Sequence, residues 1–327
     1  MSTFIMLMGL PAGGKSTFAH QLSNIHDAVI LSSDDMRKEL LGDAKIQADH
    51  QMIFSELNRR ANDYLSQGKT VIYDSTNLNR KRRKHLINHV INANNKVCYY
   101  INSQLETCIR RDAKRSRTVG NEVIKRMYKN LHIPVVNEGW DDVRFVYESN
   151  DTSIDDQKTR IKQCLFDGPN HDDLMEALMK LIPEFKVIYN LSQDSSYHSF
   201  SVSRHTYYAY KHVLDHYTGV NKLEMLWASL FHDLGKGFCK SFRNYKGEET
   251  RYANFIGHEF VSSQLAAHYL NSLGYSQQFI FSVVTLVQFH MVPLNASEKK
   301  MKETEKLIGS ELYDDLLFLH EADTLAK

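Results

Sequence analysis

The sequence lacks the hydrophobic segments that target a protein to a membrane or anchor it there. No apolar run reaches the roughly 20 residues that a membrane-spanning helix needs. The apolar stretch at residues 4–8 has no signal-peptide cleavage site after it and runs directly into glycines. We therefore expect a soluble protein with no membrane partner.

Cysteine is scarce as well. The four cysteines, Cys98, Cys108, Cys164 and Cys239, form no CxxC pair and are too few for a disulfide scaffold. A reducing, cytoplasmic location is the simplest expectation. The chain also contains no internal repeat and no low-complexity tract.

The chain is long enough for two domains, and its charge is unevenly distributed. It has 327 residues, of which 42% are hydrophobic, enough to bury two ordinary cores. Residues 1–150 hold 22 Lys+Arg against 16 Asp+Glu, a net charge of +6, and the remainder holds 18 against 23, a net charge of −5. The second part also contains ten of the sixteen histidines. A basic half suits a polyanionic partner, and an acidic, histidine-rich half suits a metal. Alternatively, the charge difference reflects only two soluble domains with different pI values.

Apolar, strand-like runs alternate with helical patterns in the first half of the chain. The run at residues 3–8 ends at Gly9, and a helical pattern follows from residue 15 to about residue 23. Such alternation predicts a parallel sheet flanked by helices, the α/β class. The other expected strands are 28–31, 70–73, 97–101 and 144–147, with helices at 47–67, 80–92 and 105–114.

The pattern changes near residue 150. Residues 148–157 are polar and indicate a boundary or linker. Beyond them the periodicity is almost wholly helical. We expect an α/β domain at 1–150, a linker and connecting helix at 151–189, and an all-α domain at 190–327. The main helices expected in this half are 172–181, 223–232, 258–273, 277–290 and 311–326.

Residues 9–16, GLPAGGKS, fit the phosphate-loop pattern GxxxxGK[ST] between an expected strand and an expected helix. Glycines in such a loop let backbone N–H groups converge on phosphate oxygens at a helix N-terminus. Lys15 would reach the β- and γ-phosphates, and the Ser16 hydroxyl would coordinate Mg²⁺. The alternative is a glycine turn without a ligand. The loop predicts a nucleotide site but does not identify the reaction.

Two polar segments, residues 32–37 and 73–79, follow the second and third expected strands. Both should lie at the carboxyl edge of the sheet, where ligands bind in α/β folds. A kinase that acts on a hydroxyl needs a carboxylate to accept its proton, and Asp34 is placed to serve. Alternatively, Asp34 or Asp35 caps the helix that begins at Met36, and one of the two can cap while the other catalyses.

Four motifs carry a resemblance to a known family. GLPAGGKST, SSDDMRKEL, DSTNLNRKRR and KRMYKN, in this order, resemble the kinase domain of phage polynucleotide 5′-hydroxyl kinases over residues 1–148. The resemblance implies ATP- and Mg²⁺-dependent phosphorylation of a 5′-OH on DNA or RNA. Asp34 would be the general base and Lys15 the catalytic lysine. The implied acceptor-binding residues are Arg37, Asp74, Thr76 and Asn77.

In that family, arginines of a lid after the fourth strand hold the ATP phosphates. Arg117 and the pair Lys125-Arg126 fall in the matching segment, together with two further arginines. The segment is about one residue short, and lysine stands where the family has arginine, so the identity of the contacting cation stays open. The implied ATP-binding residues are Gly9, Ala12, Gly13, Gly14, Lys15, Ser16, Thr17, Arg111, Arg115 and Arg126.

A basic run, Arg-Lys-Arg-Arg-Lys, occupies residues 80–84 at the start of an expected helix. Such a run is often a solvated helix face. Its position beside the expected acceptor site favours contact with a phosphate backbone, which would make binding sensitive to salt.

Histidine and aspartate residues at helical positions mark the second half. The pair His232-Asp233 lies in the sequence HDLGK, directly after an expected apolar helix. A divalent cation needs nitrogen and carboxylate ligands that converge from several helices, and this half could supply one metal or two. Any single histidine could instead be an ordinary core or surface residue. The other candidate ligands are His205, His258, His290 and Asp323.

This pattern resembles the HD superfamily of metal-dependent phosphohydrolases over about residues 190–327. The motifs are residues 193–198 with His205-Thr206, then LFHDLGK, GHE at 257–259, QFH at 288–290 and EAD at 321–323. His212 is a rival to His205 as the first ligand. The resemblance implies a core site of His205, His232, Asp233 and Asp323, a second metal or phosphate at His258 and His290, and substrate phosphate on Lys236.

The two resemblances together imply a bifunctional enzyme that heals the ends of broken RNA or DNA. One site would phosphorylate a 5′-OH. The other would remove a 2′,3′-cyclic phosphate or 3′-phosphate with a transition metal such as Mn²⁺, Ni²⁺ or Co²⁺. No ligase-like lysine motif is present, so a separate ligase should act downstream. The alternatives are a small-molecule or nucleoside kinase with a nucleotide-hydrolysing HD domain, and a kinase whose HD domain binds RNA without catalysis.

Overall fold

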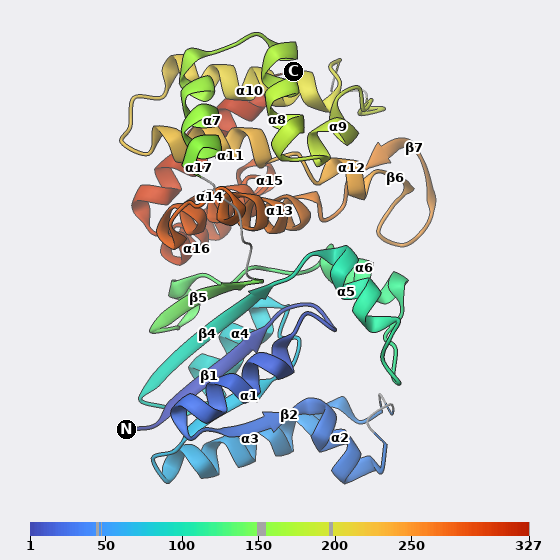
Figure 1. The fold of residues 1–327 in the computed structure, drawn as a ribbon, viewed down its shortest axis with the longest axis vertical. Coiled ribbons are helices and arrows are strands. Elements are labelled where there is room, and N and C mark those ends of the chain that lie inside the picture. The colour runs from blue at the N-terminus through green and yellow to red at the C-terminus, as the bar shows by residue number, and fades with distance from the viewer. Residues whose placement is uncertain (44–45, 47, 149–154, 196–198, 327) are drawn as a thin grey trace. The chain divides into compact units, whose positions relative to one another are not determined.

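The computed structural model describes residues 1–43, 46, 48–148, 155–195 and 199–326 (Figure 1). The chain forms two compact units, Met1–Glu148 and Ser149–Lys327. The first is an α/β unit with a parallel sheet, and the second is mainly helical, which confirms the predicted fold class.

The first unit is built on a five-stranded sheet with the order β2-β3-β1-β4-β5, in which every strand pair is parallel. The strands are apolar because helices cover a parallel sheet on its faces. Every strand that the sequence predicted is present, with ends shifted by a few residues. They are β1 (Thr3–Met8), β2 (Val29–Ser32), β3 (Thr70–Asp74), β4 (Asn95–Asn102) and β5 (Asp142–Tyr147).

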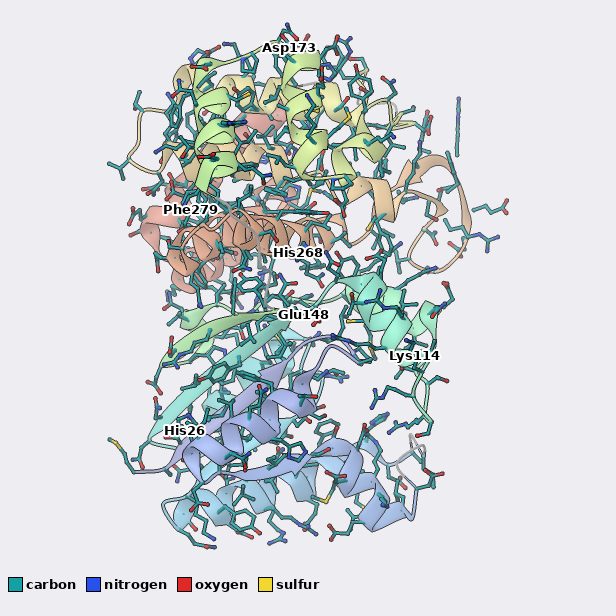
Figure 2. The ribbon with its side chains drawn as sticks, in the orientation of Figure 1. His26, Lys114, Glu148, Asp173, His268 and Phe279 are labelled. Carbon is teal, nitrogen blue, oxygen red and sulfur yellow. The ribbon has the colours of Figure 1, made fainter. Side chains whose placement is uncertain are left out.

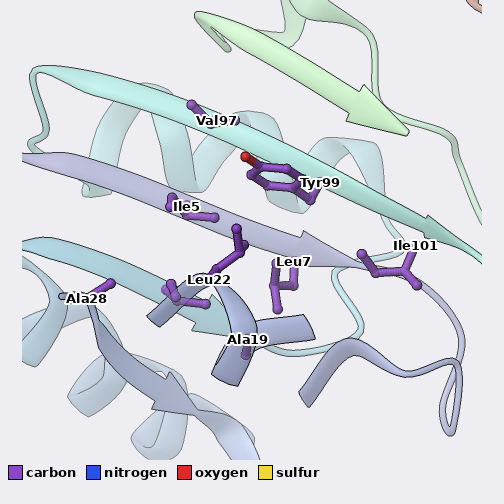
Figure 3. Packing of buried hydrophobic residues seen from close by; sticks show 9 residues of the cluster. Ile5, Leu7, Ala19, Leu22, Ala28, Val97, Tyr99 and Ile101 are labelled. Atoms are coloured by element: carbon purple, nitrogen blue, oxygen red, sulfur yellow. The ribbon is translucent and has the colours of Figure 1, made fainter. Parts of the chain in front are cut away.

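Helix α1 (Lys15–His26) packs on one face of this sheet. Its residues Ala19 and Leu22 lie among apolar side chains of β1, β3 and β4, including Ile5 and Leu7 (Figure 3). This packing fixes the start of α1 directly behind the end of β1. The loop between them, residues 9–14, therefore opens at the carboxyl edge of the sheet.

The remaining helices of this unit follow the predicted order. The helix expected at 80–92 is shorter and continues as a π-helical turn, Leu86–Val90. The longest helix, α3, buries an apolar stripe of period four, Ile53, Leu57, Ala61 and Leu65. The other helices are α2 (Ser33–Leu41), α3 (His50–Ser66), α4 (Arg80–His85), α5 (Leu105–Asp112) and α6 (Asn121–Tyr128), with a 3-10 turn at Val136–Glu138.

The second unit begins earlier than a helical domain at 190–327 would. The segment 151–189 was expected to be a linker with one connecting helix, but its described part holds three helices, α7, α8 and α9. Leu165, Leu174 and Phe185 on these helices are fully buried. Their apolar stripes therefore belong to the core of the second unit.

Helices farther along the chain carry the rest of this core. The largest buried side chain, Trp227 on α11, donates its Nε1 hydrogen to the Tyr275 hydroxyl at 3.0 Å. In the part of the second unit that the structure describes, the helices are α7 (Asp155–Asp167), α8 (His171–Leu181), α9 (Glu184–Ile188), α10 (Val202–His216), α11 (Lys222–Phe231), α12 (Lys236–Cys239), α13 (His258–Ser272), α14 (Gln277–Phe289), α15 (Val292–Asn295), α16 (Glu298–Ile308) and α17 (Ser310–Leu325).

A short antiparallel hairpin, β6 (Ser241–Arg243) and β7 (Glu249–Asn254), interrupts these helices, and the sequence did not predict it. Among the described residues, Gln277–Leu294 is the one helical segment long and apolar enough to cross a membrane by length and composition. Half of this segment is buried within the unit. A core helix passes the same test, so the segment is weak evidence of a membrane span.

Candidate active sites

The phosphate loop of the first unit is held against the neighbouring strand β4. A Cβ atom at Gly9 would lie only 2.7 Å from the Ile101 carbonyl oxygen, so this close approach requires glycine. Lys15 is buried, and its Nζ donates to the carbonyl oxygens of Gly9 at 3.1 Å and Leu10 at 2.7 Å. Burial lowers the pKa of Lys15, and the nearby carboxylate of Asp74 opposes this. The lysine therefore points into its own loop, where phosphate oxygens could replace the two carbonyls.

Ser16 and Asp74 form a pair suited to Mg²⁺. The Ser16 hydroxyl donates to Asp74 Oδ2 at 2.7 Å, and the parallel register of β1 and β3 sets Leu7 beside Asp74. Burial raises the pKa of Asp74, whereas the Ser16 hydrogen bond and Lys15 lower it. A loop hydroxyl and a strand-end aspartate are the protein ligands of Mg²⁺ in P-loop enzymes. Asp74 was expected at the acceptor, but its contact is with the ATP side.

Asn77 also lies elsewhere than expected. Its Nδ2 donates to the Leu7 carbonyl oxygen at 2.7 Å, with a left-handed backbone φ of 50°. The Gly9 N–H donates to the Thr76 carbonyl oxygen at 3.2 Å. The Asn77 amide therefore supports the end of β1 that leads into the phosphate loop, because it donates to the Leu7 carbonyl oxygen. Thr76 still lines the cleft.

The structure answers whether Asp34 caps a helix. Ser32 is the N-cap of α2, and its hydroxyl accepts hydrogen bonds from the backbone N–H groups of Asp34 and Asp35. Asp34 is therefore not needed for capping. Its Oδ1 lies 3.1 Å from NH1 of Arg37 and 3.0 Å from NH1 of Arg117. The carboxylate is half-exposed and held between two arginines.

These groups line one cleft of about 1770 Å³ at the carboxyl edge of the sheet. Arg37 is buried, and its NH2 lies 3.4 Å from Nδ1 of His50, which also lines the cleft. Glu148, labelled in Figure 2, follows β5 and pairs with Arg111 at 2.7 Å. The arginines that line the cleft are Arg37, Arg82, Arg111, Arg115, Arg117 and Arg126, together with the loop residues Ala12, Gly13, Gly14, Lys15, Ser16 and Thr17.

The structure narrows the choice of lid cations that could contact ATP to those that line the cleft. Of the pair Lys125-Arg126, only Arg126 lines the cleft, while Lys125 pairs with Glu122 at 3.0 Å. Arg117 was named only as part of the matching segment, and its contact with Asp34 links the lid to the acceptor side. The cleft is therefore lined by cations near the phosphate loop and near Asp34.

The basic run at residues 80–84 is divided between two roles. Arg83 is fully buried and donates from Nε and NH2 to the Glu138 carboxylate at 2.9 and 2.7 Å. Arg80 donates from Nε to the same carboxylate at 3.2 Å. Arg82 instead reaches the cleft. Lys81 and Lys84 are exposed and do not line the cleft. The expectation of a phosphate contact at the cleft thus narrows to Arg82.

In the second unit, two groups of residues that share Asp233 could each hold a metal ion. His205 on α10, His232 after α11 and Asp233 form one, and Asp233, His258 and His290 form the other. Asp323 on α17 joins the first group, with its Oδ1 2.9 Å from His205 Nε2 and 3.6 Å from His232 Nε2. These residues come from five helical elements, as the sequence predicted. The fit of a metal ion rests on these donor atoms.

The orientation of the four imidazoles fits a metal. Each Nδ1 faces a backbone carbonyl oxygen at 2.7–2.9 Å and must donate to it, because a carbonyl only accepts. In the neutral rings each Nε2 then carries a lone pair. Yet His205 Nε2 lies 3.2 Å from His232 Nε2, and His258 Nε2 lies 3.1 Å from His290 Nε2. Each close pair therefore needs a positive charge between its nitrogens, either a proton on one Nε2 or a metal cation that both nitrogens bind. A carbonyl on the second nitrogen is a usual arrangement of a metal-ligating histidine.

Asp233 connects the two groups. Its Oδ2 lies 3.3 Å from His205 Nε2, and its Oδ1 lies 3.2 Å from His258 Nε2. Burial lowers the pKa of His232, but the carboxylates of Asp233 and Asp323 outweigh it and raise the pKa to about 10. Burial lowers the pKa of His290 to about 3. The electrostatics therefore favour positive charge at the first group, and Asp233 is placed to bridge two ions.

Lys236 lies beside this cluster. Its Nζ donates to Gln193 Oε1 at 2.7 Å and lies 2.6 Å from Asp233 Oδ2, without the alignment of a hydrogen bond. A Cβ at Gly235 would lie 2.4 Å from the His258 carbonyl oxygen, so glycine is needed for the HDLGK loop to approach α13. The glycine thus lets one loop bring the candidate ligands His232 and Asp233 and the Lys236 ammonium group to the same cluster.

The geometry favours His205 over its rival. His212 Nε2 lies 3.3 Å from Glu321 Oε1, away from both groups. His198, quoted within the first motif, lies outside the described residues. Sequence reasoning placed the whole basic run beside the acceptor site and missed the pairing of Glu138 with Arg80 and Arg83. Their only signal was charge, which does not identify a partner.

Comparison with known families agrees with this division. Residues 4–134 match the AAA domain family and residues 196–326 match the HD domain family. An L-seryl-tRNA(Sec) kinase of Methanococcus maripaludis is 32% identical over 149 residues, which cover 42% of this chain and 55% of that protein. The transcription factor bHLH140 of Arabidopsis thaliana is 27% identical over 158 residues, 45% of this chain and 16% of that protein.

The chain therefore spans about half the length of the first relative and a sixth of the second. Within this chain, the strand order, the phosphate loop and the cation-lined cleft agree with the first family match, and the two histidine groups agree with the second. The chain joins a kinase-like P-loop domain to a helical HD domain.

Proposed function

We propose that this protein heals nucleic-acid ends: the P-loop unit phosphorylates 5′-OH ends with ATP, and the HD unit hydrolyses 2′,3′-cyclic phosphate or 3′-phosphate ends. The observation that carries the proposal is the presence, in one chain, of two independent sites for complementary phosphate chemistry. A separate ligase would seal the healed ends, in the cytoplasm.

In the kinase site, ATP supplies the phosphoryl group. Lys15 and the lid arginines would bind its phosphates, while Ser16 and Asp74 would hold Mg²⁺. Asp34 would accept the proton of the attacking 5′-OH, and Arg37 would bind the phosphate next to it. Support comes from the cations of the cleft, since Arg37 and Arg117 both contact Asp34 and Arg82 lines the same cleft.

In the HD site, a bound divalent metal supplies an activated water. His205, His232, Asp233 and Asp323 would hold one ion, and His258, His290 and Asp233 a second. Lys236 would bind the substrate phosphate, because its ammonium group already lies at the cluster beside Asp233. Asp323 is partly exposed while the four histidines are buried, so substrate would approach from the side of Asp323.

The kinase activity is tested with a labelled 5′-OH oligonucleotide and ATP. Wild-type protein should transfer phosphate, and Lys15→Ala should abolish transfer while Lys125→Ala, outside the cleft, should not. Absence of transfer by the wild-type protein to DNA and RNA ends alike would refute the kinase half of the proposal.

The phosphohydrolase activity is tested with a 2′,3′-cyclic phosphate end and Mn²⁺, Ni²⁺ or Co²⁺. Asp233→Ala should abolish hydrolysis because it removes a ligand common to both groups. Hydrolysis that survives this substitution would place the chemistry elsewhere. If the metal binds but no phosphoester is cleaved, the HD unit is a non-catalytic, RNA-binding module.

A second candidate acceptor follows from the kinase comparison. The related L-seryl-tRNA(Sec) kinase is named for an acceptor in which the hydroxyl belongs to a seryl group on a tRNA. Asp34 could accept a proton from such a hydroxyl equally well. Parallel assays with 5′-OH oligonucleotides, seryl-tRNA and mononucleosides separate the three acceptor classes, and preference for a mononucleoside would favour a small-molecule kinase.

A further inference from the structure

The β6–β7 hairpin, residues 238–256, differs in charge from the unit that contains it. It carries four Lys+Arg against two Asp+Glu, a net charge of +2, whereas the rest of residues 151–327 carries 14 against 21, a net charge of −7. Figure 1 shows the hairpin extending from the helices between α12 and α13. An isolated basic element on an acidic domain suits a polyanionic ligand.

The hairpin also exposes aromatic rings, and each ring has a cation near its face. Tyr245 is 81% exposed, and Phe242 and Tyr252 are about half-exposed. Lys246 Nζ lies 5.8 Å from the centre of the Tyr245 ring, and Arg251 Cζ lies 5.3 Å from that of Tyr252. Alternating rings and cations are the pattern with which proteins stack bases and neutralise phosphates of single strands.

The tip of the hairpin is ordered by its own hydrogen bonds. Asn244 Oδ1 accepts from the N–H groups of Lys246 and Glu248, and the Asn244 N–H donates to the Glu248 carbonyl oxygen at 2.9 Å. Gly247 adopts the left-handed φ of 85° that this turn needs. Tyr245 is therefore presented on a preformed turn, which reduces the entropy lost on stacking.

The base of the hairpin adjoins the HD site. Lys236 precedes it, and the Phe255 carbonyl at its other end accepts from Nδ1 of the candidate ligand His258. Lys240 Nζ donates to the Ser192 carbonyl oxygen, next to Gln193, which accepts from Lys236. A strand held on the hairpin would thus end near the residues proposed to bind its terminal phosphate.

We infer that the hairpin is the site at which the HD unit binds single-stranded nucleic acid, with bases stacked on Tyr245 and Tyr252 and phosphates paired with Lys246 and Arg251. The inference rests on the proposed function, because it names strands rather than mononucleotides as the substrate of that unit. Several rings along one element can stack with more than one base, whereas a mononucleotide has only one base.

The test measures binding of the full-length chain to a dye-labelled single-stranded oligonucleotide that carries phosphate at both ends. The double substitution Tyr245→Ala/Tyr252→Ala should raise the dissociation constant at least about tenfold, from the strength of two base–aromatic stacks. Phe166→Ala, which removes an exposed ring from α7, should leave it unchanged. Lys246→Gln/Arg251→Gln should lower the slope of log affinity against log salt by roughly 1.4.

The outcomes separate the inference from the proposed function. Unchanged affinity in both double variants overturns the inference, whatever the enzyme hydrolyses. Weakened binding with wild-type protein inactive on strand ends keeps the hairpin as a nucleic-acid site but refutes the end-healing proposal. If the tyrosine variant loses hydrolysis of a small phosphodiester to the same extent as that of a strand end, the hairpin has only a structural role, and the inference fails.

Discussion

Replacing Glu138 by glutamine should destabilise the first unit by about 3–5 kcal/mol, the usual cost of removing one partner from a buried ion pair. The Glu138 side chain has no exposed surface and that of Arg83 only 1%. Its Oε1 accepts from Arg83 NH2 and Arg80 Nε, and its Oε2 accepts from Arg83 Nε. The carboxylate is the counter-charge for both arginines.

The size of the destabilisation expected for Glu138→Gln follows from this geometry. A glutamine amide has one acceptor oxygen and one donor NH₂, so in either orientation one of the two Arg83 contacts becomes donor against donor. The guanidinium stays buried without a neutralising charge. At about 2–4 °C per kcal/mol for a unit of this size, the midpoint of thermal unfolding should fall by roughly 6–20 °C.

Urea unfolding followed by hydrogen exchange and mass spectrometry can resolve the first unit from the second. The matched control is Glu148→Gln, which breaks the half-exposed pair with Arg111 and should cost less than about 1 kcal/mol. If Glu138→Gln costs no more than this control, the reasoning that Glu138 neutralises Arg80 and Arg83 is wrong.

Three further predictions concern the two sites. Mn²⁺ at about one hundred times its dissociation constant should stabilise the second unit by about 2.7 kcal/mol in a melting assay. His205→Ala should lose this stabilisation and His212→Ala should keep it. The reverse result would make His212, and not His205, the metal ligand. Arg82→Ser should raise the KM for a 5′-OH oligonucleotide several-fold, and a similar effect of Lys81→Ser, outside the cleft, would contradict a specific phosphate contact. Asp74→Asn should raise the Mg²⁺ concentration for half-maximal phosphorylation about tenfold with little change in oligonucleotide KM; an effect on KM alone would return Asp74 to the acceptor site.

The sequence alone was sufficient for the fold class and for the motifs that mark each candidate site. Continuous apolar runs and apolar residues at helical spacing are local properties, and they predicted the five strands and the long helices such as α13 and α14. The loop at residues 9–16 was equally readable, because a phosphate cradle needs glycines and a lysine at fixed spacing. The HDLGK motif indicated the second candidate site, because its adjacent histidine and aspartate can both be metal ligands.

Tertiary structure decided what each polar side chain contacts. Glu138 is 55 residues from Arg83, and no local pattern links them. Asp74 and Asn77 lie in one motif, yet strand register turns the first toward Ser16 and the second toward β1. Sequence proposed His205 and His232 as ligands, but only packing shows their Nε2 atoms facing each other while carbonyls hold each Nδ1. Spacing along the chain fixes which residues share an element, whereas side-chain contacts depend on how distant elements pack.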